Sequence, residues 1–270
     1  MGIFSRGDRR SPRKQTRLDE TRPTDNATHF GFQEVDAGDK SEMVADVFHS
    51  VAPRYDLMND LMTLRLHRRW KSQTIKIADI KPGEDVLDLA SGTGDLALRI
   101  ADKVGPDGSV VVSDINSSML AGAKEKFSKR DVTAQITFVE ADAEELPFDD
   151  ASFDLVTISF GMRNVTNKSR SMAEILRVLR PGGRLLILEF SRPVAAPVRP
   201  FYDAYSFAVI PTMGKVVLND AASYRYLAES IRVHPDRDRL RVMLDDVGFV
   251  RTDYTTMLFG IVAAHRGFKA

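Results

Sequence analysis

The sequence predicts an α/β protein with an open, doubly wound and mostly parallel sheet of seven strands. Helices cover both faces of this sheet, and a helical cap precedes it. Three observations predict this class. From residue 85 onward, short runs rich in Val, Ile and Leu alternate with amphipathic helical patterns. A glycine-rich turn joins the first run to the first helix, and two apolar segments near the end follow each other directly, as in a closing β-pair.

The chain before residue 80 divides into a tail and a cap. Residues 1–22 carry seven Lys or Arg against three Asp or Glu and little that can be buried. We therefore expect residues 1–40 to be a largely disordered basic extension, and weak contact with an anionic membrane is the alternative. Residues 41–80 show the pattern of two or three amphipathic helices interrupted near Pro53, which form the expected cap.

The alternation of strands and helices fills the middle of the chain. Strands are predicted at 85–90, 109–114, 136–142, 153–160 and 184–190. Helices are predicted between them at 95–103, 116–129 and 168–180. The segments 249–257 and 258–267 supply the closing pair. Residues 41–270 are thus expected to form one domain without internal repeats.

The segment after the fifth strand is longer than an ordinary connection. Residues 192–235 begin with a stretch that is rich in Pro and aromatic residues. We interpret it as an insertion on the acceptor side of the site, either an apolar cleft or a surface that faces a membrane. A buried core helix is an equally good account of the same pattern.

The composition excludes several classes of function. Lys and Arg together number 38, equal to Asp and Glu, so a basic excess that would favour nucleic acid is absent and no nucleic-acid partner is predicted. Cysteine is absent, which excludes disulfides, zinc–thiolate sites and cysteine nucleophiles, and no metal site is predicted. No apolar run reaches the roughly 18 residues that span a bilayer.

The glycine turn VLDLASGTGDLA (86–97) is the first candidate site. Gly92 and Gly94 permit a tight turn and close approach of a ligand, and Asp114 lies where an acid that binds ribose is expected. These features suit either NAD or S-adenosylmethionine (SAM). Asp95 would repel a pyrophosphate at the helix N-terminus, whereas the sulfonium and ammonium of SAM favour carboxylates. The sequence therefore favours SAM, with helix capping as the structural alternative for each Asp.

Two further strand ends complete the expected cofactor site. The third strand ends in EADAEELPF (140–148), where Asp142 can accept from an adenine amine and the Ala143 N–H can donate to the ring. The fourth strand delivers Ser159 to the crevice where the strand order reverses. Taken together, residues 80–190 resemble the class I SAM-dependent methyltransferases, a Rossmann-like family.

Longer segments narrow the resemblance. The segments YDLMNDLMTLRLHRRWK (55–71) and RVLRPGGRLLILEFS (177–191) resemble the signatures of the ubiquinone/menaquinone biosynthesis C-methyltransferases. The same holds for THFGFQ (28–33), ISFGMRNVTNK (158–168), YDAYSF (202–207), NDAASYRYLAESIRVHP (219–235) and HRGFK (265–269). The resemblance implies C-methylation of a polyprenylated quinol with SAM as methyl donor. It places cofactor contacts at Thr93, Asp114, Asp142, Ala143 and Ser159, although Asp142 stands where the family pattern has Asn.

Catalytic roles follow from the chemistry of a quinol ring, which becomes more nucleophilic as its hydroxyl loses a proton. Arg163 stays protonated, so we expect it to stabilise the developing phenolate while Asn164 orients the hydroxyl. A surface position for Arg163 is the alternative. The proton acceptor is left open between water, Tyr55 and His67, and His67 also suits a structural role. Tyr55 is included among the expected catalytic residues.

The expected partners follow from the same resemblance. They are a lipid quinol and other enzymes of quinone synthesis. The protein is expected to be cytoplasmic, with a peripheral contact to the inner face of the membrane. A homo-oligomer stays open. Two rival functions are a catalytically silent SAM-binding partner in a quinone-synthesis assembly and an NAD(P)-dependent oxidoreductase.

Overall fold

A computed structural model describes residues 27–51, 55–193, 196–218 and 220–270. It contains a seven-stranded sheet in the order β5-β4-β3-β6-β7-β9-β8 and a separate two-stranded sheet. The strands of the large sheet are β3 (Asp85–Leu89), β4 (Ser109–Asp114), β5 (Gln135–Glu140), β6 (Phe153–Ser159), β7 (Leu179–Phe190), β8 (Val250–Met257) and β9 (Val262–Phe268). The predicted mostly parallel sheet of seven strands is confirmed.

The closing pair supplies the only antiparallel pairings of this sheet in the described part of the chain. Strand β9 is antiparallel to both β7 and β8, whereas β3, β4, β5, β6 and β7 pair in parallel. The strand order reverses between β3 and β6, which makes the gap beyond their carboxyl ends the expected place for a ligand. Strand β7 begins at Leu179, earlier than predicted, because Leu179 already pairs with Phe153 before a register shift.

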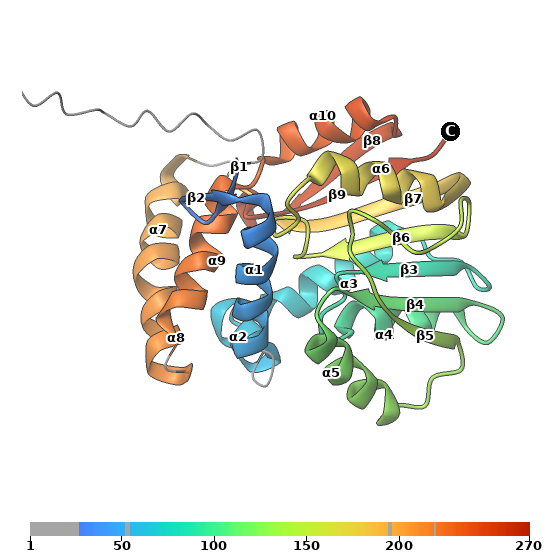
Figure 1. Cartoon of the computed structure of the whole chain (residues 1–270), viewed down its shortest axis with the longest axis horizontal. Coiled ribbons are helices and arrows are strands. Elements are labelled where there is room, and N and C mark those ends of the chain that lie inside the picture. Colours follow the sequence, from blue (N-terminus) through green and yellow to red (C-terminus); the bar gives the residue numbers. More distant parts are fainter. Residues whose placement is uncertain (1–26, 52–54, 194–195, 219) are drawn as a thin grey trace, which may run out of the picture.

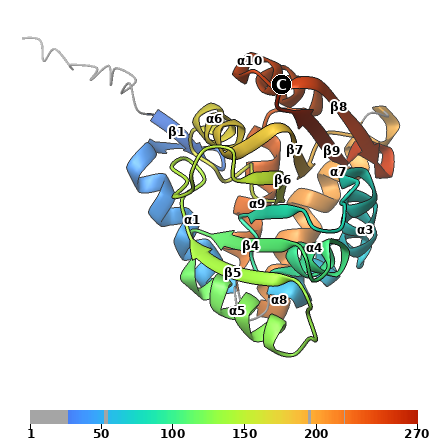
Figure 2. The ribbon, with the colours of Figure 1, turned by 90° about the vertical axis from the view of Figure 1, so that its right-hand side faces the viewer.

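Both faces of the sheet are covered because strand side chains alternate between them. Val86, Leu155 and Leu186 pack under α3 (Leu66–Ala78), α4 (Asp95–Val104) and α5 (Ser117–Ser128). Helices α3 and α4 lie next to each other (Figure 2). The opposite face packs under α6 (Lys168–Val178) and α10 (Arg237–Val247). The predicted covering of both faces is confirmed.

The remaining helices gather beyond one end of the strands (Figure 1). They are α1 (Ala37–Val51), α2 (Tyr55–Met62), α7 (Arg199–Ala204), α8 (Ile210–Leu218) and α9 (Ala221–Val233), together with the short η2 (Ala196–Val198). Met119, Ile210 and Tyr224 form a small core there, with Phe48 and Met62 packed against it. Helices α1 and α2 thus build one covering layer with α7, α8 and α9, which are far from them in the sequence, whereas α3 of the expected cap packs on a face of the sheet.

Helices α7 and α8 are joined by a π-helical turn, η3 (Tyr205–Val209). Pro211 follows this turn and has no N–H to donate to the preceding turn, so the wider turn accommodates it. Gly214 lies against α9, because a Cβ at this position would come within 2.1 Å of the Tyr224 ring. Both features allow α8 and α9 to pack closely.

A β-hairpin, β1 (Ala27–Phe30) and β2 (Gln33–Asp36), precedes α1. The expectation of a largely disordered extension over residues 1–40 is wrong for residues 27–40, whereas residues 1–26 lie outside the described residues. The hairpin is held by packing that local sequence does not reveal. Phe30 stacks on Tyr226 with ring centroids 4.1 Å apart, and the Phe32 N–H donates to Glu229. Within the described residues, no helix is both long and apolar enough to cross a membrane.

Candidate active site

Two adjoining cavities lie at the carboxyl end of the sheet, below the cap. The cavity beside α2 and α3 has a volume of about 960 Å³, and the cavity beside β4 and β5 has about 880 Å³, each including space open to solvent. We refer to them as the acceptor cavity and the cofactor cavity. Phe48, Ala90, Gly92, Ser159 and Phe160 line both, so the two spaces meet at the ends of β3 and β6.

The glycine turn forms the wall between these cavities. Gly92 and Gly94 adopt positive φ angles of 57° and 75°, as the tight turn requires. Gly92 lines both cavities and Gly94 lines neither, and the expected cofactor contact of Gly94 stays a prediction. Instead, a Cβ on Gly94 would lie 3.1 Å from the Phe127 ring, and its role is to let α4 and α5 approach.

Asp114 ends β4 and ties this turn to the next loop. Its two carboxylate oxygens accept from the Gly92 N–H at 2.8 Å and the Asn116 N–H at 2.9 Å. Burial raises the pKa of Asp114, and these backbone hydrogen bonds act in the opposite direction. Asp114 lines the cofactor cavity, as expected for an acid that binds a ribose.

The other expected cofactor residues lie along the same cavity. Asp142 and Ala143 form its wall beyond β5, where Asp142 Oδ1 accepts from the Glu144 N–H at 2.8 Å. Ser159 lines both cavities, and its buried hydroxyl has no hydrogen-bond partner among the described residues. The predicted positions therefore converge on one space, apart from Thr93 and Gly94.

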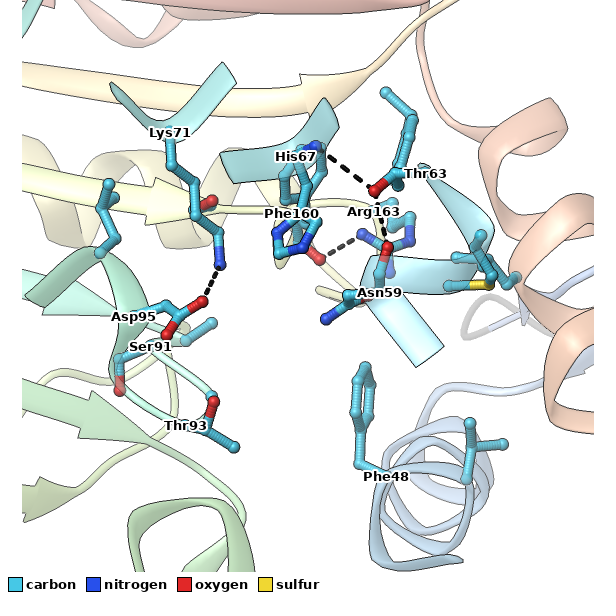
Figure 3. A pocket seen from close by; sticks show the side chains of 18 of the residues that line it. Phe48, Asn59, Thr63, His67, Lys71, Ser91, Thr93, Asp95, Phe160 and Arg163 are labelled. Carbon is cyan, nitrogen blue, oxygen red and sulfur yellow. Dashed lines mark hydrogen bonds and ion pairs between the residues drawn. The ribbon is translucent and has the colours of Figure 1, made fainter. Parts of the chain in front are cut away.

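Thr93 lines the acceptor cavity within a network of two carboxylates and two lysines. Its hydroxyl donates to Asp56 at 2.9 Å and accepts from Lys126 at 2.9 Å. Asp95 accepts from Lys126 at 2.8 Å and from Lys71 at 3.3 Å (Figure 3). Burial alone would raise the pKa of Asp95, but the two lysines lower it further than burial raises it. Because its charge is balanced, Asp95 alone does not distinguish SAM from a dinucleotide.

Asp88, which lies in β3 just before the glycine turn, is 1% exposed. Thr157 donates to its Oδ1 at 2.5 Å, and its Oδ2 has no partner among the described residues. Burial raises the pKa of Asp88 to about 7. Asp88 lines the acceptor cavity and changes protonation near neutral pH, so it is not a permanent anion.

Arg163 lies in the acceptor cavity and is buried, which excludes the surface position considered for it. Its Nη1 lies 3.1 Å from Glu189 Oε1 and also donates to the Phe160 carbonyl. Its guanidinium stands over the Phe190 ring at 5.8 Å. The Nε atom has no partner among the described residues. Arg163 is thus a cation held in place by a buried carboxylate, with a donor to spare.

Asn164 lines the cofactor cavity and not the acceptor cavity. Its Oδ1 accepts from the Tyr226 hydroxyl at 3.0 Å, and Tyr226 itself lines the acceptor cavity. Burial raises the pKa of Tyr226 to about 12, so the phenol remains a neutral donor. The amide and the phenol connect the two cavities.

His67 projects into the acceptor cavity from α3 (Figure 3). Its Nε2 lies 2.8 Å from Asp60 Oδ1, and its buried Nδ1 has no partner among the described residues. Burial lowers the pKa of His67 more than the hydrogen bond to Asp60 raises it. Tyr55 begins α2, but its side chain lies outside the described residues, so its expected role stays a prediction.

Sequence reasoning missed Lys71, Lys126, Tyr226 and Glu189. Lys71 lies four residues after His67 and therefore on the same face of α3, a signal that was available in HRRWK. Local patterns do not reveal Glu189 or Tyr226 as site residues. Glu189 lies within the pattern of a strand, and Tyr226 lies within the pattern of an amphipathic helix. Among the described residues, no group of three His, Cys, Asp or Glu side chains could hold a metal ion.

Comparison with known proteins adds to this geometry. The model of the ubiE/COQ5 methyltransferase family matches residues 36–269. The ubiquinone/menaquinone biosynthesis C-methyltransferase UbiE of Proteus mirabilis (strain HI4320) is 53% identical over 92% of this chain and 99% of the relative. The protein of that name from Pseudomonas paraeruginosa (strain DSM 24068 / PA7) is 54% identical over 90% of this chain and 94% of the relative.

Solved structures share the fold at low identity. A SAM-dependent methyltransferase from Aquifex aeolicus aligns with a TM-score of 0.56 and 16% identity over 74% of this chain and 89% of its own. A Haemonchus contortus N-methyltransferase in complex with phosphomonomethylethanolamine and S-adenosylhomocysteine aligns with a TM-score of 0.55 and 16% identity, over 74% of this chain and 52% of its own. These likenesses concern the fold.

Proposed function

Because the chain belongs to the ubiE/COQ5 methyltransferase family, we propose that its two cavities bind SAM and a polyprenylated quinol side by side. The protein is a SAM-dependent C-methyltransferase of quinone biosynthesis. Its proposed acceptors are demethylmenaquinol, which becomes menaquinol, and 2-methoxy-6-polyprenyl-1,4-benzoquinol, which receives a methyl group at carbon 5. The single observation that carries this assignment is the junction of the cavities at Ser159 and Phe160.

The cofactor cavity suits the adenosine half of SAM. Asp114 offers carboxylate oxygens to the ribose hydroxyls, and Asp142 with Ala143 offers an acceptor and a donor to adenine. Lys71 and Asp88 stand at the other end, beside the glycine turn. The Lys71 ammonium suits the carboxylate of the methionine part, and the Asp88 carboxyl suits its ammonium. This direction leaves the sulfonium at the junction of the cavities, where the methyl group faces the acceptor.

Arg163 is proposed to stabilise the negative charge on the quinol oxygen. Transfer forms a bond from the ring carbon to the methyl group and breaks the sulfur–methyl bond, whose electron pair stays on sulfur. The ring carbon then loses its hydrogen and aromaticity returns, so one proton is released overall. A buried guanidinium favours the anionic ring more strongly than it would in water, and Glu189 fixes its position without reaching the ring itself.

His67 is the side chain that best suits the role of proton acceptor. Asp60 accepts a hydrogen bond from Nε2, which leaves the lone pair on Nδ1. Nδ1 is buried, and the His67 side chain lines the same cavity as Arg163. The lowered pKa of His67 keeps the ring neutral at neutral pH and able to take the hydroxyl proton. Asp60 orients the ring and stabilises the imidazolium that forms.

A peripheral membrane contact is proposed for the outer surface of the cap, where the prenyl chain would enter. Phe201 on α7 is 76% exposed and Val216 on α8 is 79% exposed. Phe207 and Phe32 are also exposed, and their rings stack with centroids 6.1 Å apart. Such grouped apolar side chains are typical of surfaces that meet lipid or another protein.

The decisive test supplies purified protein with SAM labelled at the methyl group and with each quinol in turn. We expect label in the lipid extract with at least one acceptor. Binding of SAM without transfer to either would favour a silent partner protein, and binding of NADH without binding of SAM would favour an oxidoreductase. Mass spectrometry of quinones in a deletion strain then identifies which demethylated precursor accumulates in the cell.

A further inference from the structure

A third cavity adjoins the acceptor cavity, because Arg163 and Tyr226 line both. Its volume is about 410 Å³, including space open to solvent. It lies between the β1–β2 hairpin, the start of α1, the loop after β6 and the end of α9. Three of the segments that carry the family resemblance meet there: residues 28–33, 158–168 and 219–235. Methyl transfer, as described above, uses none of the lysines or histidines in this space.

The walls of this third cavity carry more positive than negative charge. Lys40 is 4% exposed, and its ammonium donates to the Val165 carbonyl at 3.4 Å. Lys168 donates to the same carbonyl at 2.8 Å and to the Arg163 carbonyl at 3.5 Å. Within the part of the chain that the structure describes, neither lysine forms an ion pair. Arg163 lines the cavity as a third cation.

The nearby carboxylates do not balance this charge. Glu189 is paired with Arg163 at 3.1 Å. Glu144 acts on both lysines only over a longer distance, and its Oε1 accepts from the Asn167 N–H at 2.8 Å. An ammonium that is withdrawn from water without a counterion destabilises the fold. A bound anion would remove that cost.

His234 supplies an independent observation. It lines the third cavity and is 4% exposed, yet neither of its ring nitrogens has a hydrogen-bond partner among the described residues. Burial lowers its pKa well below the usual value, and Lys168 and Arg163 lower it further, so the ring is neutral and carries one N–H. An N–H without an acceptor inside a protein is costly unless a ligand accepts from it.

We propose that this third cavity is a binding site for a small oxyanion of the phosphate class. The ammonium groups of Lys40 and Lys168 supply the charge, and the N–H of His234 supplies a directional donor. The oxygens of a tetrahedral anion accept hydrogen bonds from ammonium groups and from imidazole N–H groups alike. The site goes beyond methyl transfer, and its existence does not depend on the identity of the quinol.

Anion binding changes the protonation of the lysines. Burial and the neighbouring Lys40 lower the pKa of Lys168 to about 8, so part of its population is neutral at pH 8. A bound anion raises this pKa, and the protein takes up protons as the anion binds. The charged groups that act on Lys168 are Lys40, Glu144 and Glu189. Arg163, His234 and His29 line the same cavity.

The test is calorimetric titration of the full chain with inorganic phosphate at pH 8, in two buffers that differ in ionisation enthalpy. We expect one site per chain and net proton uptake. Lys168→Met and His234→Leu should each weaken phosphate binding at least 10-fold, whereas Lys103→Met, on an exposed lysine of α4, should leave it within twofold. Lys40→Met provides a third variant if one of the others fails to fold. SAM affinity, measured in parallel, establishes that each variant is folded.

Two results of the titration would contradict the anion site. Absence of phosphate binding to the wild-type chain, or binding that all three cavity variants retain, would overturn the proposal. A second arm uses vesicles of phosphatidylglycerol against phosphatidylcholine to identify the source of the phosphate. The cavity receives a lipid headgroup if free phosphate competes with the anionic vesicles and Lys168→Met abolishes binding of both phosphate and vesicles. The cavity receives free phosphate if Lys168→Met weakens phosphate binding but leaves vesicle binding unchanged.

Discussion

Glu189 holds Arg163 by two contacts: Oε1 lies 3.1 Å from the guanidinium Nη1, and Oε2 accepts from the Arg163 backbone N–H at 3.1 Å. Both side chains are almost fully buried. One carboxylate therefore fixes both the loop after β6 and the direction of the cation that this loop carries. Glu189 belongs to β7 and Arg163 lines the acceptor cavity, so a shift of either residue moves the cation that is proposed to act on the ring.

Removal of Glu189 should destabilise the protein strongly. Glu189→Leu leaves a buried guanidinium without its carboxylate, and we expect a loss of about 3–5 kcal/mol in the free energy of unfolding. The measurement is urea unfolding followed by circular dichroism. Arg241→Ala is the matched control, because it removes an exposed ion pair within α10 and should cost less than about 0.5 kcal/mol. Equal losses for the two variants would contradict the assignment.

Substitution of Arg163 should affect the chemical step more than cofactor binding. Arg163→Met removes the cation while keeping much of the side-chain volume, and we expect kcat to fall about 10²–10³-fold. SAM should still bind within about threefold of the wild-type affinity, because Arg163 does not line the cofactor cavity. Single-turnover kinetics and calorimetry measure the two effects. Full turnover in this variant would rule out the proposed role.

The pair of His67 and Asp60 predicts a pH profile. Because burial lowers the pKa of His67, kcat/KM should rise with pH through a value below 6.5 and then level off. Asp60→Asn removes the carboxylate that raises this pKa, so the acidic limb should move to lower pH while the plateau falls. Arg68→Met is the control, since Arg68 also binds Asp60, at 2.6 Å, but does not line the acceptor cavity. An unchanged profile in His67→Gln would show that water or Tyr55 takes the proton.

Asp114 should control the affinity for SAM. An Asn at this position cannot accept from both the Gly92 and Asn116 N–H groups, and it loses the charged acceptor for the ribose. We expect the Kd for SAM to rise about 10–100-fold, which corresponds to the loss of a charge-assisted hydrogen bond. Asp107→Asn, at an exposed position in the loop before β4 and so at the opposite end of this strand from Asp114, should leave Kd unchanged. Calorimetry decides between these expectations.

Acid should destabilise the protein through its buried histidines. Burial lowers the pKa of His265 to about 4, and the pKa values of His67 and His234 are lowered too. The unfolded chain binds these protons near pH 6.5 but the folded chain does not, so stability is full above that pH and is lost as pH falls. Between pH 7 and pH 5, His265 alone should contribute about 2 kcal/mol. In His265→Gln, urea midpoints should depend less on pH over this range.

The sequence was sufficient for the sheet and for most of the cofactor positions, because both depend on local patterns. Alternating apolar runs and the glycine turn give the order of elements, and Asp114 and Ser159 follow from their places at strand ends. It was insufficient for the hairpin at 27–36, whose order comes from stacking of Phe30 on Tyr226, about 200 residues away in the chain. The balance of charge around Asp95 was missed for the same reason, since Lys71 and Lys126 reach it from two other helices.

Phe48 has a consequence for the timing of the reaction cycle. It lies on α1 (Figure 3) and lines both the cofactor cavity and the acceptor cavity, so one helix borders both proposed binding sites. A movement of α1 would therefore widen both spaces together, which couples exchange of spent cofactor to release of the methylated product. We therefore expect a pre-steady-state burst of product followed by a slower phase, with helix opening as the slow event of each turnover.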